Sequence, residues 1–203
     1  DTLTYTMSGA PSTLSISSGT ISGTPLNADV GAHTIIVTAT DGSNAAVSDT
    51  FILTVTNTND APTVANAIAD ASTAEDAAYT LSLSNVFTDV DTGDSCTYSM
   101  SGAPSTLSLS SGTISGTPIN ANVGSHTIVV TCTDGSSAAV SDSYDLTITN
   151  TNDAPTVTSA ISDGSIAEDA SYSLNAAAAF TDVDSSDTLT YTMSGAPSTL
   201  SIS

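Results

Sequence analysis

The side chains most capable of chemistry in this sequence are carboxylates, which recur in short clusters. Asn-Thr-Asn-Asp occurs at residues 57–60 and 150–153, Asp-Val-Asp at residues 89–91 and 182–184, and a Glu-Asp pair at residues 75–76. Two carboxylates separated by one residue in a loop offer oxygens on the same side. Calcium takes about six to eight oxygen ligands from carboxylates, amide side chains and backbone carbonyls. The clusters therefore predict calcium binding.

The composition excludes several other classes of ligand. The 203 residues include 21 acidic residues and no Lys or Arg, which gives a formal net charge of −21. Without cationic side chains the chain cannot clamp a phosphate, steer nucleic acid or bind an anionic membrane. No apolar run approaches the ~18 residues of a membrane span. Clustered carboxylates that lack cationic partners can be neutralised only by divalent metal or by protons.

The chain is a tandem array. The string Met-Ser-Gly-Ala-Pro-Ser-Thr-Leu begins at Met7, Met100 and Met193, which sets a repeat of about 93 residues. Residues 187–203 are identical to residues 1–17, as expected for a piece of a longer regular array. The Pro that follows each Asn-Thr-Asn-Asp motif ends one domain and fixes the start of the next. We expect the C-terminal part of one repeat, a complete repeat and the N-terminal part of a third, at residues 1–60, 61–153 and 154–203.

Within each copy the hydrophobic pattern is that of β-strands. In residues 51–56 apolar and polar positions alternate, and in the second copy Ile52 becomes Asp145 while the apolar set is kept as Tyr144, Leu146 and Ile148. A position that accepts Asp faces water, as a period of two requires. Residues 17–20 and 41–44 read as hairpin turns. The single Ala run, at residues 176–179, falls at a strand or loop position. The sequence predicts an all-β fold.

The order of the motifs carries a family resemblance. Glu-Asp, Asp-Val-Asp, Ser-Gly-Thr-Pro, Thr-Asp-Gly and Asn-Thr-Asn-Asp-Ala-Pro follow one another as in the cadherin-like repeats of dystroglycan type, which are common in large bacterial surface proteins. The resemblance covers the whole sequence. It implies a linear array of tandem immunoglobulin/cadherin-like β-sandwich domains of ~93 residues, located outside the cell or on its surface, with Ca²⁺ between the repeats.

Alternate loops of an immunoglobulin-like sandwich cluster at each end, which places the acidic loops beside the linkers. At the first junction we expect the ligands Asn57, Asn59, Asp60, Asp89, Asp91 and Asp134, and the resemblance adds Asp29. At the second junction we expect Glu75, Asp76, Asn150, Asn152, Asp153, Asp182 and Asp184. Because Asn122 stands in the place of Asp29, the second junction is expected to hold less metal or to bind it more weakly. For Asp134 alone, a role in stabilising its turn explains the residue equally well.

The two cysteines are both in the complete copy. Cys96 replaces Leu3 and Leu189, and Cys132 replaces Ala39. Two independent buried thiols are one interpretation. In one copy a large residue and a small residue have both become Cys, and the two strands that carry them are neighbours in an immunoglobulin sheet. This pattern favours a disulfide. A disulfide also implies an oxidising compartment.

The function that follows is structural. The sequence shows no nucleophile elbow and no glycine-rich phosphate loop. A glycosidase would use paired carboxylates in an aromatic-lined site, and this chain has no Trp and 4% aromatic residues. We therefore expect no enzyme, but a segment of a long extracellular fibre or surface stalk that is stiffened by calcium and contacts neighbouring repeats and other copies. The alternative is an adhesin module that binds carbohydrate or a cell-surface partner.

Overall fold

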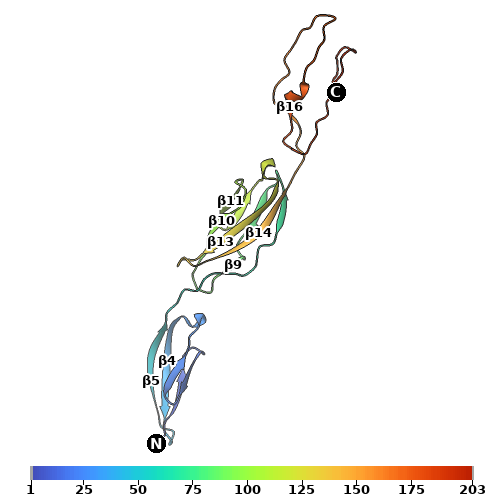
Figure 1. Cartoon of the computed structure of the whole chain (residues 1–203). Coiled ribbons are helices and arrows are strands. Elements are labelled where there is room, and N and C mark those ends of the chain that lie inside the picture. Colours follow the sequence, from blue (N-terminus) through green and yellow to red (C-terminus); the bar gives the residue numbers. More distant parts are fainter. Residues whose placement is uncertain (1, 203) are drawn as a thin grey trace. The chain divides into compact units, whose positions relative to one another are not determined.

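The computed structural model describes residues 2–202, which consist almost wholly of β-strands and loops (Figure 1). The all-β prediction is confirmed. The chain divides into two compact units. One contains the chain up to Ala67 together with Asn85–Ser99 and Thr131–Asp142, and the other contains Ile68–Ser84, Met100–Val130 and the chain from Ser143 onward. Each unit holds one of the two acidic junctions.

The first copy forms a three-stranded antiparallel sheet and a separate hairpin. The sheet order is β1-β4-β5, and the hairpin is β2-β3. Their bounds are β1 (Thr4–Ser8), β2 (Leu14–Ser17), β3 (Thr20–Gly23), β4 (Gly31–Thr40) and β5 (Ala46–Val55). Ser17 pairs with Thr20 across a two-residue turn in which Ser18 and Gly19 have φ of 49° and 79°. Positive φ at both central positions is the geometry that matches strand twist in a tight hairpin, and this predicted turn is confirmed.

The complete copy has two larger sheets. The first has the strand order β10-β13-β14-β7, the second has the order β11-β12-β8, and β6 pairs with β9. Strand β7 runs parallel to β14, with Leu146 opposite Ala71. The bounds are β6 (Thr63–Val64), β7 (Ala71–Ala74), β8 (Tyr79–Ser82), β9 (Phe87–Thr88), β10 (Thr97–Ser101), β11 (Leu107–Ser110), β12 (Thr113–Gly116), β13 (Gly124–Thr133) and β14 (Ala139–Thr149).

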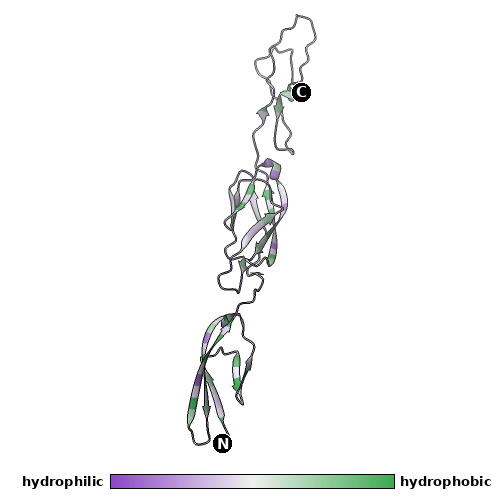
Figure 2. Ribbon diagram, turned by 90° about the vertical axis from the view of Figure 1, so that its left-hand side faces the viewer, coloured by the Kyte–Doolittle hydropathy of each residue, from purple (hydrophilic) through white to green (hydrophobic). Residues whose placement is uncertain are grey.

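Alternation along the strands builds the core, and Figure 2 shows hydrophobic and hydrophilic residues mixed along them. On β14, Tyr144, Leu146 and Ile148 are buried while Asp145 is exposed, which confirms the predicted facing of this strand. The β-branched and aromatic residues suit a half-buried pleated surface. Burial of each large apolar side chain contributes roughly 1.5–3 kcal/mol to the free energy of unfolding.

The third copy contains little regular structure. Strand β15 (Thr156–Val157) pairs with β16 (Phe180–Thr181), and residues 158–175 contain no strand. The Ala run is neither strand nor plain loop but a single-turn 3₁₀ helix, η3 (Ala176–Ala179), whose Ala177 amide donates to the Asn175 side chain at 3.1 Å. Asn175 caps the turn, and Ala has no side-chain entropy to lose in it.

Two further 3₁₀ helices lie close to the junctions. They are η1 (Asn27–Asp29) and η2 (Asn120–Asn122), which precede β4 and β13. A three-residue helix is shorter than one hydrophobic period, so the sequence pattern could not reveal them. Each carries an Asn, Asn27 or Asn120, whose side chain donates to the second Asp of an Asp-Val-Asp loop.

Candidate metal-binding junctions

The first junction is built where the linker meets the loop after β9. The Asp60 backbone amide donates to Asp91 Oδ2 at 2.7 Å, and the Asp91 amide donates to Asp89 Oδ1 at 2.9 Å. The side-chain amide of Asn27 donates to Asp91 Oδ1 at 2.6 Å. Asp91 is buried by these contacts. The linker and the Asp-Val-Asp loop are thereby joined, although 31 residues separate their hydrogen-bonding groups.

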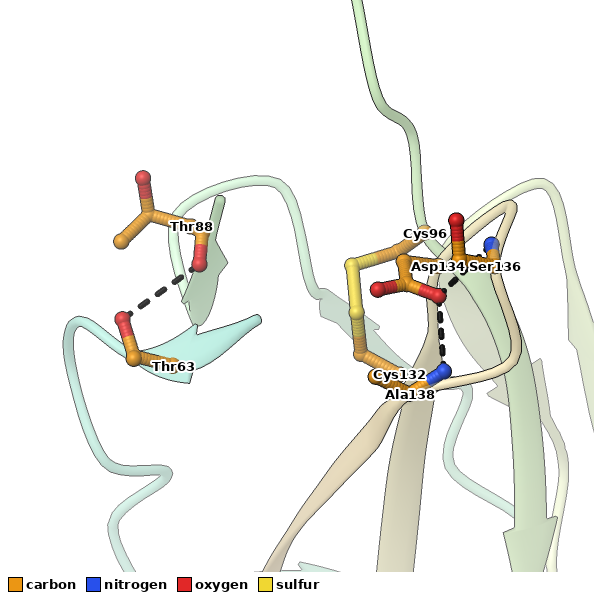
Figure 3. The surroundings of a disulfide bond; sticks show 7 residues. All are labelled: Thr63, Thr88, Cys96, Cys132, Asp134, Ser136 and Ala138. Carbon is orange, nitrogen blue, oxygen red and sulfur yellow. Dashed lines mark hydrogen bonds between the residues drawn. A yellow bond between two sulfur atoms is a disulfide. The ribbon is translucent and has the colours of Figure 1, made fainter. Parts of the chain in front are cut away.

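Asp134 brings the β13–β14 hairpin to the same junction. Its Oδ1 accepts the amides of Ser136 and Ala138 at 2.9 and 2.8 Å, as Figure 3 shows. Its Oδ2 accepts the side-chain amide of Asn59 at 2.9 Å. Asp134 therefore stabilises its turn through Oδ1 and contacts the linker through Oδ2, so the two explanations that the sequence left open both apply.

Three carboxylates converge at this point. Oxygens of Asp89, Asp94 and Asp134 lie within 4.8 Å of one another. Asp89 Oδ2 is buried and has no hydrogen-bond partner. A buried carboxylate oxygen without a partner is costly unless a cation neutralises it. The donor set consists only of oxygens, which suits Ca²⁺.

The pKa values of these carboxyls move in opposite directions. The Asp60 backbone amide and the Asn27 side chain lower the pKa of Asp91, although burial works against them. The Asn59 side chain and the hairpin amides lower the pKa of Asp134. Burial, and then repulsion from Asp89, Asp134 and Asp91, raises the pKa of Asp94. Asp94 is thus the member of the cluster whose charge is least compensated by the protein.

The second junction repeats this arrangement in the other unit. The Asp153 amide donates to Asp184 Oδ2 at 2.7 Å, and the Asp184 amide donates to Asp182 Oδ1 at 3.0 Å. The Asn120 side chain donates to Asp184 Oδ1 at 2.9 Å. Burial and the charges of Asp76, Asp184 and Asp182 raise the pKa of Asp153.

Glu75 completes the second junction from the turn between β7 and β8. Oxygens of Glu75, Asp153 and Asp184 lie within 4.8 Å of one another. Glu75 is 2% exposed, its Oε1 accepts the Thr151 amide at 2.8 Å, and its Oε2 is buried without a partner. A buried carboxylate aimed at two others, with one oxygen unsatisfied, is a site that fits a divalent cation.

Asp29 has a local role. Its Oδ2 accepts the Leu26 amide at 2.9 Å and the Thr13 hydroxyl at 2.7 Å, and these bonds lower its pKa. Asn122 accepts the equivalent two bonds from Ile119 and Thr106. The Asp-to-Asn difference between copies therefore preserves the turn, and weaker metal binding at the second junction stays a prediction.

Sequence reasoning missed two groups. The side chains of Asn27 and Asn120 donate to Asp91 and Asp184. In these two segments the sequence analysis considered only Asp29 and Asn122, which lie two residues further along. Asp94, three residues after Asp91, is not among the expected ligands, yet its carboxylate lies in the cluster with Asp89 and Asp134. The signal was available: both copies keep Asn at 27 and 120, and both keep the last Asp of Asp-Val-Asp-x-x-Asp, at 94 and 187.

The cysteines lie beside the first junction. Cys96 and Cys132 are joined by a disulfide with a Cα–Cα distance of 5.1 Å, drawn in yellow in Figure 3. Cys132 is buried at the end of β13 that leads into the Asp134 hairpin. The bridge thus ties the base of the acidic hairpin to the strand preceded by Asp94.

Replacing Asp94 tests the uncompensated charge. In chelator at neutral pH, Asp94→Asn should raise the melting temperature, because the folded state holds this charge less well than the unfolded state does. As pH falls through the raised pKa of Asp94 toward the ordinary value of 3.8, the difference in melting temperature between Asp94→Asn and wild type should vanish, because Asp94 of the wild type becomes protonated and neutral. Calorimetry across this pH range measures it.

Asp91→Asn is the matched control for that experiment. Hydrogen bonds lower the pKa of Asp91, so the stability that its charge confers is present above the ordinary value of 3.8 and is lost as pH falls through the lowered pKa. Asp91→Asn should therefore lower the melting temperature at neutral pH in chelator. Equal shifts in the two variants would contradict the assignment of different roles.

The fold and the junctions define a class of protein: tandem β-sandwich repeats joined through acidic linkers. A family model described as "Putative Ig domain" matches residues 1–56 and 61–149. The chain belongs to this immunoglobulin-domain family. Serine-rich adhesins for platelets from Staphylococcus aureus strains MRSA252 and MSSA476 are each 35% identical over 156 residues, 75% of this chain. The chain spans 11% and 7% of their lengths.

Solved cadherin ectodomains share the fold. Mouse cadherin-23 EC22-24 has a TM-score of 0.53 at 17% identity and covers 74% of this chain and 53% of its own. Human mucin-like protocadherin EC1-2 has a TM-score of 0.52 at 17% identity, over 74% of this chain and 86% of its own. The predicted class of immunoglobulin/cadherin-like sandwiches is confirmed.

These relationships place the chain among the repeats of surface proteins, and the predicted extracellular or cell-surface location is confirmed by kinship with the staphylococcal adhesins. Within residues 2–202 no helix has the length and apolar character needed to cross a membrane.

Proposed function

We propose that this chain is a structural segment of an extracellular fibre or surface stalk, in which calcium bound at the repeat junctions stiffens the linkers. The observation that carries the proposal is the convergence of three carboxylates within 4.8 Å at each junction, in a sequence without Lys or Arg. Each junction also contains one buried carboxylate oxygen without a hydrogen-bond partner.

Residues of the linker and of the flanking loops would hold the ion. At the first junction the converging carboxylates are Asp89, Asp94 and Asp134, which lie in two loops of the complete copy. At the second they are Glu75, the linker residue Asp153, and Asp184. Asp60 and Asp91, with the side chains of Asn57 and Asn59, remain candidates at the first junction. Asp76 and Asp182, with Asn150 and Asn152, remain candidates at the second. A bound ion would supply the positive charge that the chain itself lacks.

Stiffening follows because the ligands come from separate segments. At the second junction Glu75, Asp153 and Asp184 come from the complete copy, the linker and the third copy, and at the first junction the linker residue Asp60 would join the loop carboxylates. An ion shared in this way resists bending of the linker, and chelation releases it. Small-angle scattering of the chain should show a larger maximum dimension and a narrower distribution of conformations in calcium than in chelator at equal ionic strength. Identical scattering curves would contradict the proposal.

Adhesion is the second candidate function. It is favoured by the 35% identity with proteins named as adhesins for platelets. An adhesin module would bind a carbohydrate or a cell-surface partner through the sandwiches, with the junctions only as supports. Binding of the purified chain to immobilised glycans and to cells tests this, and retention of binding by a variant with both junctions disabled would separate adhesion from stiffening.

We propose no catalytic role for the carboxylate clusters. Their oxygens are engaged by linker and turn amides, as at Asp91 and Asp134, which is the pattern of a structural site. Kinship with adhesin repeats and the cadherin-like fold support a structural or adhesive module.

A further inference from the structure

The disulfide joins the two segments that carry the converging carboxylates of the first junction. Cys96 lies two residues after Asp94, and Cys132 lies two residues before Asp134. Figure 3 shows the bridge at the base of the hairpin that holds Asp134. Oxygens of Asp94 and Asp134 lie within 4.8 Å of each other and of an oxygen of Asp89. The covalent link and the carboxylate cluster are therefore parts of one local structure.

The two segments differ in what else holds them in place. Asp134 is fixed by hydrogen bonds from the amides of its own hairpin. Residues 89–96 contain no strand, and the Asp94 amide donates to the Asp91 carbonyl at 3.2 Å, which is at the long end of the usual range. The disulfide anchors the end of this loop to β13. It therefore restricts the positions that are open to Asp94.

The position in which the bridge holds Asp94 is electrostatically unfavourable without a cation. A carbon placed at the Cβ position of Gly135 would lie 3.8 Å from Asp94 Oδ1, so this carboxylate lies beside the acidic hairpin. Like charges this close repel each other, and the chain contains no Lys or Arg to offset them. A loop that was free to move would relieve the repulsion by carrying Asp94 away. The bridge opposes that movement and keeps the carboxylates at a spacing from which they can share an ion.

We propose that the Cys96–Cys132 disulfide positions Asp94 for calcium, so that the first junction binds the ion more tightly with the bridge closed than with it reduced. The inference rests on the proposed calcium junctions and adds to them a dependence on redox state. Ligands that are already in place bind an ion without the entropic cost of ordering them. Because the two equilibria are linked, calcium should make the bridge harder to reduce by the factor by which reduction weakens calcium binding.

The bridge also makes the junctions of one array unequal. The third copy keeps the acidic residue of the loop as Asp187, but Leu189 stands in the place of Cys96. An acidic loop without the bridge must be ordered by the ion itself, at a cost in affinity. As calcium rises, the junction beside the disulfide should therefore fill, and stiffen its linker, before an otherwise identical junction that lacks the bridge.

Calcium titration of the full chain tests the proposal. Asp182→Ala with Asp184→Ala disables the second junction, so that isothermal titration calorimetry reports the first. The protein is titrated oxidised and after reduction by dithiothreitol, whose dithiol passes two electrons and two protons to Cys96 and Cys132 and becomes a cyclic disulfide. We expect the calcium dissociation constant to be about tenfold higher after reduction. Cys96→Leu with Cys132→Ala should give the weaker value with or without the reductant.

Moving the bridge separates positioning of Asp94 from general stabilisation of the fold. Leu3→Cys with Ala39→Cys, added to the variant that lacks the native bridge, places a disulfide in the first copy. Strand β4 begins at Gly31, just after η1, so Ala39 lies ~25 Å along the strand from the junction. The moved bridge should raise the unfolding midpoint in urea without restoring the affinity for calcium.

The reciprocal measurement uses the native bridge as its own probe. Cys96 is only partly buried, so a reductant can reach its sulfur. Wild type is equilibrated with mixtures of reduced and oxidised dithiothreitol, in calcium and in chelator at equal ionic strength, and thiols are alkylated and counted by mass spectrometry. The ratio of reduced to oxidised reagent that opens half of the bridges should be about tenfold higher in calcium. In chelator, Asp94→Asn should raise this ratio above that of wild type, because one of the repelling charges is gone.

The possible outcomes separate this inference from the proposed function. Equal calcium affinities with the bridge closed and open, or affinity restored by the moved bridge, would overturn the inference and leave the calcium junctions standing. Bridges that open equally in calcium and in chelator would do the same. Calcium that fails to bind in either redox state would overturn both proposals. If circular dichroism shows that the reduced chain unfolds, the variant with Leu and Ala at the two cysteine positions supplies the comparison.

Discussion

Calcium should raise the free energy of unfolding of this chain by about 2.7 kcal/mol per site when its free concentration is about a hundred times the dissociation constant. The reason is mass action: the carboxylates of each junction come together only in the folded chain, so the ion binds the folded state and stabilises it. Differential scanning calorimetry in calcium and in chelator, at equal ionic strength, measures the effect. Monovalent salt should reproduce only the part that arises from screening.

Substitutions at one junction should remove only the part of the calcium-induced stabilisation that this junction contributes. Asp89→Ala with Asp91→Ala should remove the contribution of the first junction, and Asp182→Ala with Asp184→Ala that of the second. Asp49→Asn is the control, because Asp49 is exposed and its Oδ1 accepts the amide of the adjacent Thr50 at 2.9 Å. If all three variants gained as much stability from calcium as wild type, the junctions would not be the binding sites.

Removing the disulfide should have an effect of similar size. Cys96 and Cys132 are 36 residues apart, and a bridge over that length should stabilise the folded state by roughly 3–4 kcal/mol in the chain-entropy model. Cys96→Leu with Cys132→Ala installs the residues of the other copies, which avoids a buried polar group. Urea unfolding followed by fluorescence of the tyrosines should give a lower midpoint, while the variant still folds.

Two further measurements test the disulfide itself and its effect in another copy. Mass spectrometry of freshly isolated protein under non-reducing conditions should find no free thiol, and two free thiols would refute the bridge. Leu3→Cys with Ala39→Cys places the same pair in the first copy, where β1 and β4 are neighbours in the sheet. A rise in its unfolding midpoint under oxidising conditions would show that the strand geometry, and not the identity of one copy, makes the bridge stabilising.

Local features of the fold could be predicted because they depend on neighbours in sequence. The alternation that buries Leu146 and exposes Asp145 follows from the pleat of a single strand. The Ser18-Gly19 turn follows from the need for positive φ at both positions. The Ala run at 176–179 misled the prediction because the conformation of so short a segment is decided by its Asn175 cap.

The partners of individual carboxylates could not be predicted from spacing. Asn27 reaches Asp91 across 64 residues and Glu75 reaches Thr151 across 76, and such distances depend on how loops from separate strands fold together. Asp29 matched a ligand position by resemblance, yet its carboxylate accepts the Leu26 amide, because the turn of η1 places that amide within reach.

The sequence by itself determined the repeat, the all-β class, the acidic linkers and the absence of any cation to neutralise them, because these are properties of composition and of local periodicity. Tertiary structure alone decided which three carboxylates converge at each junction and which oxygens of Glu75 and Asp89 are buried without a partner. It also decided that the pKa of Asp94 is raised whereas that of Asp91 is lowered. The physical reason is that charge repulsion and desolvation act through distances in space, and the chain sets those distances only when its sheets have paired.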